Sequence, residues 1–196
     1  MRKILILLFI FSLISLSFAL NDDKSYVENL IKTTTNKVLS ILNEKGIGEA
    51  KKKEEIFKTV NPIFDFNIMA RLALGRKNWN KLTKEQRKKF IELFTKRIRM
   101  VYLDRVTLKK VKVTFKKAIQ KKKNIIFMPV IASTKEKDYS ILFKFWKSPK
   151  GWKVYDVEVE GVSIIRTYRS QFNQILSKGT VKDLFKKLEE GSTTKK

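Results

Sequence analysis

The chain of 196 residues contains no cysteine and no histidine. Without cysteine it can form neither a disulfide nor a lipoprotein attachment, so stability must come from burial of apolar side chains. The absence of both residue types excludes thiol nucleophiles and the usual zinc sites, and it removes the commonest general base. These absences favour a binding function over a catalytic one.

Acidic residues are also scarce, because 19 Asp and Glu face 44 Lys and Arg, a net charge of +25. Two of the basic residues lie in positions 1–19, so the remaining chain carries +23. Such a charge favours binding to a polyanion, which can be nucleic acid, an anionic membrane surface or an acidic protein. The simpler interpretation is a solvated, lysine-rich surface. The lysine runs at 51–53 and 121–123 are not interleaved with the aromatic residues that single-strand binders use.

The first nineteen residues have the pattern of a secretory signal peptide. Arg2 and Lys3 precede an apolar run over 4–16, and Ser17 and Ala19 provide small residues at a cleavage site. The run is shorter than the ~20 residues of a spanning helix. We therefore predict a signal peptide at 1–19, one domain at 20–190 and a flexible tail at 191–196, with the mature protein outside the cytoplasm.

Hydrophobic periodicity predicts helices on both sides of a set of strands. The expected helices are 22–43, 49–60, 65–74 with Asp65 as N-cap, 83–106 opened by a Thr83–Gln86 capping box, 162–178, and 180–188 capped by Thr180 and Asp183. The expected strands are 110–116, 124–131, 139–146 and 152–159. Short connections favour antiparallel pairing. The predicted fold class is α+β, a twisted antiparallel sheet of about four strands wrapped by helices.

No catalytic constellation stands out. Asp156, Glu158 and Glu160 alternate along one strand and share a face. We expect them to be outward charges that balance nearby lysines rather than a metal or acid site. The apolar faces are more informative, but periodicity alone favours an ordinary packed core and does not distinguish a filled core from a hollow one.

Two segments go beyond periodicity. Residues 61–75 read NPIFDFNIMARLALG, and residues 151–163 read GWKVYDVEVEGVS, followed by Tyr-Arg-Ser-Gln-Phe at 168–172. In this order and behind a signal peptide, they resemble the MlaC family of periplasmic phospholipid-binding proteins, also called toluene-tolerance or ABC-transport auxiliary proteins. The resemblance extends from about Tyr26 to Leu188.

The resemblance implies a fold partly like that of nuclear-transport-factor-2 proteins, with an apolar cavity between sheet and helices that takes phospholipid tails. It implies a periplasmic carrier that catalyses no reaction, has no cofactor beyond its phospholipid cargo, and helps to maintain outer-membrane lipid asymmetry. The implied partners are an inner-membrane ABC transporter with an MCE-domain subunit and an outer-membrane lipoprotein–porin complex. We also expect transient contact with anionic membrane, and no nucleic acid.

The shared apolar faces together with the resemblance predict the cavity lining. The predicted lipid-contacting residues are Phe94, Ile98, Tyr102, Phe115, Ile126, Met128, Ile141, Phe143, Val157, Val162, Ile165 and Phe172. Arg169 is expected to be a charge partner for Asp65 or Asp156. Two alternatives stay open: an enzyme on a related cone-shaped fold that uses Asp156 or Asp65 with Tyr102, and a protein that binds polyanions by charge alone.

Overall fold

The computed structural model describes residues 23–103 and 111–190. The predicted signal peptide, the predicted tail and the end of the helix expected to reach residue 106 lie outside the described residues. The helices are α1 (Asp23–Asn43), α2 (Glu49–Val60), the 3₁₀ turn η1 (Asn61–Ile63), α3 (Phe66–Leu74), α4 (Arg76–Asn80), α5 (Lys84–Leu103), α6 (Ile164–Lys178) and α7 (Val181–Glu190). Within the described ranges, none of these helices combines the length and the apolar character that crossing a membrane requires.

The strands of the described residues form one antiparallel sheet. They are β1 (Lys112–Phe115), β2 (Ile119–Lys122), β3 (Ile125–Ser133), β4 (Asp138–Ser148), β5 (Gly151–Val159) and β6 (Val162–Ser163). Their order is β1-β3-β4-β5-β6, and β2 pairs with β3 beside β1. The predicted α+β class and antiparallel sheet are confirmed. The sequence did not indicate β2 and β6, because one is short and lysine-rich and the other has only two residues.

A break separates β1 from β2 along the same edge of β3. The amide of Lys116 donates to the carbonyl of Pro129 at 3.1 Å, so the main-chain polar groups of Pro129 point toward this edge. Proline has no N–H to return a bond to Lys116, and the ladder of β1 ends at this position. The amide of Ala118 instead donates to Glu28 of α1 at 2.7 Å. The break therefore ties α1 to the edge of the sheet.

Side-chain caps begin three helices where the sequence predicted them. The amide of Thr83 donates to the Gln86 side chain at 3.0 Å, and the amide of Gln86 donates to the Thr83 hydroxyl at 3.2 Å. At α7 the amide of Thr180 donates to Asp183 at 2.7 Å, and the amide of Asp183 donates to the Thr180 hydroxyl at 3.3 Å. Asp65 caps α3 by accepting from the amide of Ile68 at 3.0 Å. Such caps satisfy amides that a helix start leaves without partners.

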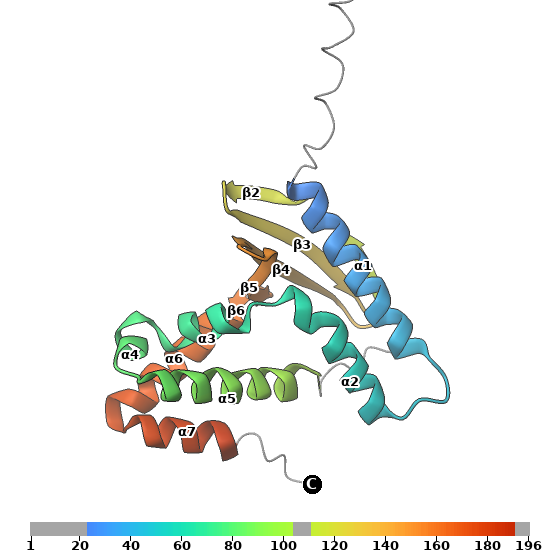
Figure 1. Ribbon diagram of the computed structural model, residues 1–196. Coiled ribbons are helices and arrows are strands. Elements are labelled where there is room, and N and C mark those ends of the chain that lie inside the picture. The colour runs from blue at the N-terminus through green and yellow to red at the C-terminus, as the bar shows by residue number, and fades with distance from the viewer. Residues whose placement is uncertain (1–22, 104–110, 191–196) are drawn as a thin grey trace, which may run out of the picture.

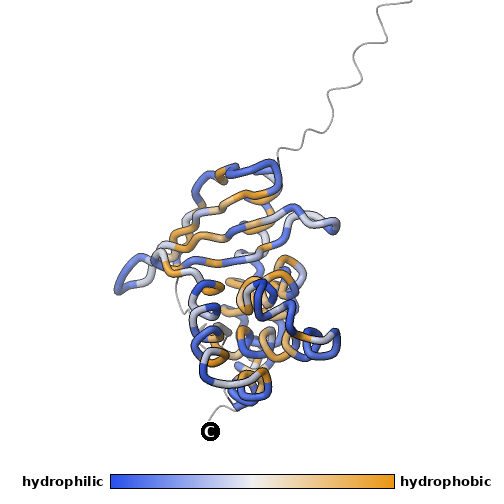
Figure 2. The backbone as a smooth tube through the Cα atoms, turned by 90° about the vertical axis from the view of Figure 1, so that its left-hand side faces the viewer, coloured by the Kyte–Doolittle hydropathy of each residue, from blue (hydrophilic) through white to orange (hydrophobic). Residues whose placement is uncertain are grey.

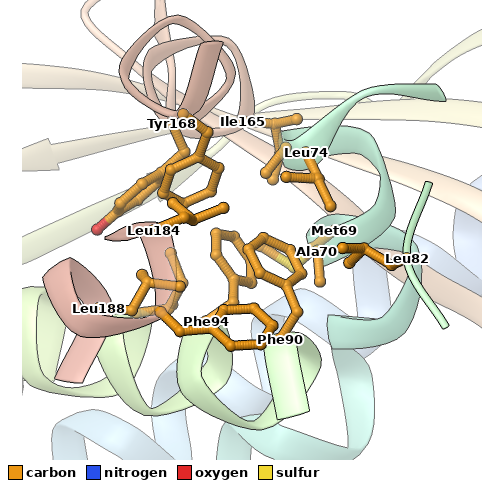
Figure 3. Packing of buried hydrophobic residues seen from close by; sticks show 14 residues of the cluster. Met69, Ala70, Leu74, Leu82, Phe90, Phe94, Ile165, Tyr168, Leu184 and Leu188 are labelled. Atoms are coloured by element: carbon orange, nitrogen blue, oxygen red, sulfur yellow. The ribbon is translucent and has the colours of Figure 1, made fainter. Parts of the chain in front are cut away.

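The helices α3, α5, α6 and α7 pack around a filled aromatic core, shown in Figure 3. The Phe94 ring lies 6.0 Å from that of Phe90, 5.4 Å from Tyr168 and 6.2 Å from Phe172. Burial raises the pKa of the Tyr168 hydroxyl. Rings at these distances fill the space between them. We call this cluster the helical core.

A second filled core lies between α1 and the sheet, which α1 crosses in Figure 1. Val27 and Ile31 of α1 pack with Ile126, Met128 and Phe145 of the central strands, all at most 2% exposed. Figure 2 shows the matching pattern: apolar stretches run along the strands, and hydrophilic loops connect them. We call this cluster the sheet core.

Asp156 joins the sheet to the helical layer. Its carboxylate accepts from the Ser163 hydroxyl at 2.8 Å, from the amide of Ile165 at 3.2 Å and from the ammonium of Lys144 at 3.2 Å. Only 5% of Asp156 is exposed, so the expectation that it is an outward charge is wrong. Ser163 also caps α6, and so the carboxylate fixes where this helix leaves the sheet.

Glu158 also differs from the expectation, because its side chain is only 15% exposed. It bonds Lys144 from the same face as Asp156, and it pairs with Arg166 at 3.0 Å. Burial lowers the pKa of Lys144, but hydrogen bonds and charges from the two carboxylates outweigh it, so the net shift is upward. Glu160 lies in the turn after β5 and is exposed, as expected.

The sequence suggested that Arg169 pairs with Asp65 or Asp156, but the structure shows neither pair. Its guanidinium donates to the carbonyl of Leu72 through Nε at 2.8 Å and Nη2 at 2.6 Å. Leu72 lies in the last turn of α3, where carbonyls lack partners within the helix. Arg169 therefore joins α6 to the end of α3.

We predict that Asp65→Ala lowers the free energy of unfolding by about 0.5–2 kcal/mol, because α3 loses its N-cap. The carboxylate also accepts from the Trp146 indole at 3.2 Å, so the indole loses a partner too. Chemical denaturation measures the change. Asn67→Ala, an exposed change in the first turn of α3, is the control and should stay within about 0.5 kcal/mol. Equal stabilities of the two variants would contradict the role of the cap.

Candidate functional site

An apolar cavity of about 360 Å³ lies between the helical core and the sheet core. Met69 and Ile98 form its wall on the side of the helical core, and Val130 and Val157 form its wall on the side of the sheet core. Phe64 packs against both cores and closes the seam between them. The cavity therefore lies between two clusters that Phe64 and Ile164 connect.

On the helix-facing side of the sheet, burial of the side chains decreases toward the cavity. Phe145 and Val154 are paired across β4 and β5 and are 0% exposed. On the same face, Ile141, Phe143 and Val159 are only partly buried although helices lie over the sheet. Large apolar residues in the central strands of a covered sheet are normally buried in a close-packed interior. Their exposure here arises because they border the cavity.

A bulge in β5 directs side chains into this space. Phe145 pairs with Val154 while Lys144 pairs with Asp156, so Tyr155 has no opposite partner. An extra residue of this kind shifts the alternation of the strand. It places Val157 on the same face as Val154, although three positions separate them.

Helices α1 and α2 form a further part of the cavity wall. The lining residues from them are Ile31, Thr34, Thr35, Val38, Leu39, Ile56, Phe57 and Val60. The prediction from sequence included none of these residues. The apolar stripes of the two helices were visible in the sequence, but periodicity does not show whether a stripe meets a filled core or open space.

The predicted lipid-contacting residues with described side chains are distributed over four places. Ile98, Ile141, Phe143 and Val157 line the cavity. Phe94, Ile165 and Phe172 lie in the helical core, Ile126 and Met128 lie in the sheet core, and Phe115 packs against the sheet core. Val162 is 61% exposed on β6. Tyr102 belongs to α5, and its side chain is outside the described part of the structure. Contact of any of these residues with a ligand stays a prediction.

Polar chemistry is sparse in the cavity wall. Among the described residues that line it, Thr34, Thr35 and Arg99 carry the polar side chains, and none is acidic. The carboxylate of Asp156, which one alternative made catalytic, lies on the other face of the sheet and is held by Lys144 and Ser163. No group of acidic residues in the described ranges is arranged to hold a metal ion. The arrangement suits burial of an apolar ligand rather than proton transfer.

The fold and the cavity together define an α+β protein that encloses an apolar ligand site. The chain belongs to the MlaC family, because the sequence model described as MlaC protein matches residues 32–190. This confirms the resemblance drawn from the motifs at 61–75 and 151–163.

A solved structure of the same fold is the phospholipid-binding protein from Ralstonia solanacearum, determined in complex with a phospholipid. It superimposes with a TM-score of 0.75 and 24% sequence identity, over 84% of this chain and 96% of that chain. No curated protein sequence matches the chain.

We predict that enlarging a side chain has opposite consequences in the cavity and in the helical core. Phe143→Trp places extra atoms in open space, so the free energy of unfolding should stay within about 0.5 kcal/mol of its original value. Phe94→Trp overpacks a filled cluster and should cost about 1–3 kcal/mol. Denaturant titration of both variants compares them. A cost for Phe143→Trp as large as that for Phe94→Trp would show that the space is not available.

Proposed function

We propose that the protein is a phospholipid carrier that holds acyl tails in the cavity between the helical core and the sheet core. The observation that supports this best is an apolar space of about 360 Å³ between two separate clusters of buried hydrophobic residues. Membership of the MlaC family and the phospholipid complex of the neighbour from R. solanacearum point to the same ligand class.

The energetics of tail burial agree with a closed site. Two acyl tails carry on the order of 30 CH₂ groups, and each is worth about 0.8 kcal/mol when hidden from water. An open surface cannot cover that much apolar area, so the tails need an apolar enclosure, and the cavity walled by α1, α2, α5 and the sheet offers one. A site for acyl tails therefore requires cavity walls that are apolar and that do not close on each other.

We infer the cellular setting from the sequence pattern and the family. The signal-peptide pattern of residues 1–19 and the cleavage site near Ala19 suit a periplasmic protein. In that compartment the carrier would move phospholipid between the outer and inner membranes and maintain lipid asymmetry. Its proposed partners are an inner-membrane ABC transporter with an MCE-domain subunit and an outer-membrane lipoprotein–porin complex.

The positive charge has a separate role in this proposal. Lys112 on β1, Lys116 directly after β1, and Lys121 and Lys122 on β2 are exposed, and none of them lines the cavity. Lys110, which the sequence places in the same group, lies outside the described residues. We propose that these lysines attract acidic partners or anionic membrane without holding the tails.

Native mass spectrometry of the protein, produced with its signal peptide and purified without detergent, tests the carrier function. We expect masses that correspond to protein with bound phospholipid, because a cavity of this kind fills from the membranes of the host. Phe143→Trp should lower the lipid content while the protein stays folded. A protein free of lipid that also takes none from phospholipid vesicles would refute the carrier function.

We predict that added salt slows lipid transfer between two vesicle populations while bound lipid per protein stays constant. Exposed charges act over a Debye length of about 8 Å at physiological salt, whereas tail burial depends little on salt. Changing Lys112 and Lys116 to glutamate should slow transfer in the same way. Transfer that is insensitive to both changes would show that the charge has no part in delivery.

A further inference from the structure

One cationic side chain belongs to the described part of the cavity wall. Arg99 and its neighbour Ile98 both line the cavity from the last turns of α5. Ile98 is 8% exposed, whereas Arg99 is exposed. The guanidinium therefore lies at the rim, where the apolar space meets water.

Arg99 is held at this rim by an aromatic ring. The guanidinium carbon lies 4.6 Å from the ring centroid of Phe57, which is also part of the cavity wall. A cation–π contact of this kind positions the charge without using its N–H donors. The donors remain available to a ligand at the mouth of the cavity.

The charge of Arg99 is not neutralised by a described carboxylate. The pKa of Glu54 on α2 is lowered mainly by its hydrogen bond with Lys58, and the charge of Arg99 makes a smaller contribution. Glu54 already pairs with Lys58 at 3.1 Å. Among the described residues, none forms an ion pair with Arg99. An apolar wall with a cation at its rim that forms no described ion pair suits a ligand with apolar tails and an anionic head.

We propose that Arg99 binds the phosphate of the lipid whose tails occupy the cavity, and that it thereby selects phosphate-bearing lipids over uncharged lipids with the same tails. This inference rests on the proposed carrier function and adds the ligand group that the rim recognises. A guanidinium suits the task because its planar fork matches two phosphate oxygens. The hydroxyls of Thr34 and Thr35 are the other polar groups of the described lining, and they suit the ester oxygens beside the phosphate.

Two lipids with identical tails separate head recognition from tail burial. Dioctanoyl phosphatidylglycerol carries the phosphate, and dioctanoylglycerol lacks it. Each displaces a fluorescent fatty-acid probe from the purified protein, and the ratio of their dissociation constants is the readout. We expect the phospholipid to bind about tenfold more tightly to the original protein. In Arg99→Gln the ratio should fall to about one, and Arg99→Lys, which keeps the charge but loses the fork, should lie between.

Lys96→Gln is the matched control, because it removes one positive charge from an exposed position of α5 outside the lining. It should keep the original ratio. If Arg99→Gln weakened both lipids equally, Arg99 would only support the wall, and the proposal would be overturned. Displacement of the probe by inorganic phosphate alone, at the concentration that suffices for the phospholipid, would also overturn it, because the site would then recognise free phosphate.

The same assay separates this proposal from the carrier function. If both lipids bound with equal affinity to the original protein, recognition by Arg99 would be wrong and the carrier function would stand. If neither lipid displaced the probe, both would fall.

Discussion

A cavity with apolar walls tends to collapse, because contact between its walls would bury the same surface with no ligand present. Something other than apolar packing must hold the walls apart. In this protein polar links along β5 connect the sheet to the helices. Asp156 holds the start of α6, and the amide of Asp65 donates to Val154 at 2.9 Å where α3 begins. Arg169 then joins α6 to α3. These links lie outside the cavity lining and fix the distance between the layers.

This separation explains why the chain has two cores instead of one. The rings around Phe94 stabilise the helices without reaching the sheet, and Val27 and Ile31 stabilise α1 on the sheet without reaching α7. Each cluster can be packed to ordinary density by itself. The apolar area left between them contributes to stability only when a ligand covers it. A ligand that binds the folded state alone then stabilises that state by an amount that grows with the logarithm of the ligand concentration relative to its dissociation constant.

The sequence predicted what depends on neighbours along the chain. The bounds of α2, the cap at Asp65 and the Thr83–Gln86 box follow from local signals, and the structure confirms them. The cavity lining depends on the distance between layers, which periodicity does not contain. Phe94 and Phe143 both occupy apolar faces, yet one is surrounded by rings and the other borders open space. The bulge at Tyr155 was equally invisible, because it depends on the partner strand.

The same arrangement separates affinity from delivery in the proposed carrier. Tails that leave a bilayer for an apolar cavity exchange one apolar environment for another, so the net free energy of transfer is small and the exchange runs in either direction. The direction is then set by which partner binds the loaded form and which binds the empty form, since a ligand-linked equilibrium shifts only with differential affinity. Exposed charge is suited to that choice of partner, because it acts on encounter and docking while the cavity contents stay unchanged. A chain with 44 basic side chains and an almost wholly apolar cavity wall keeps the two tasks on different surfaces.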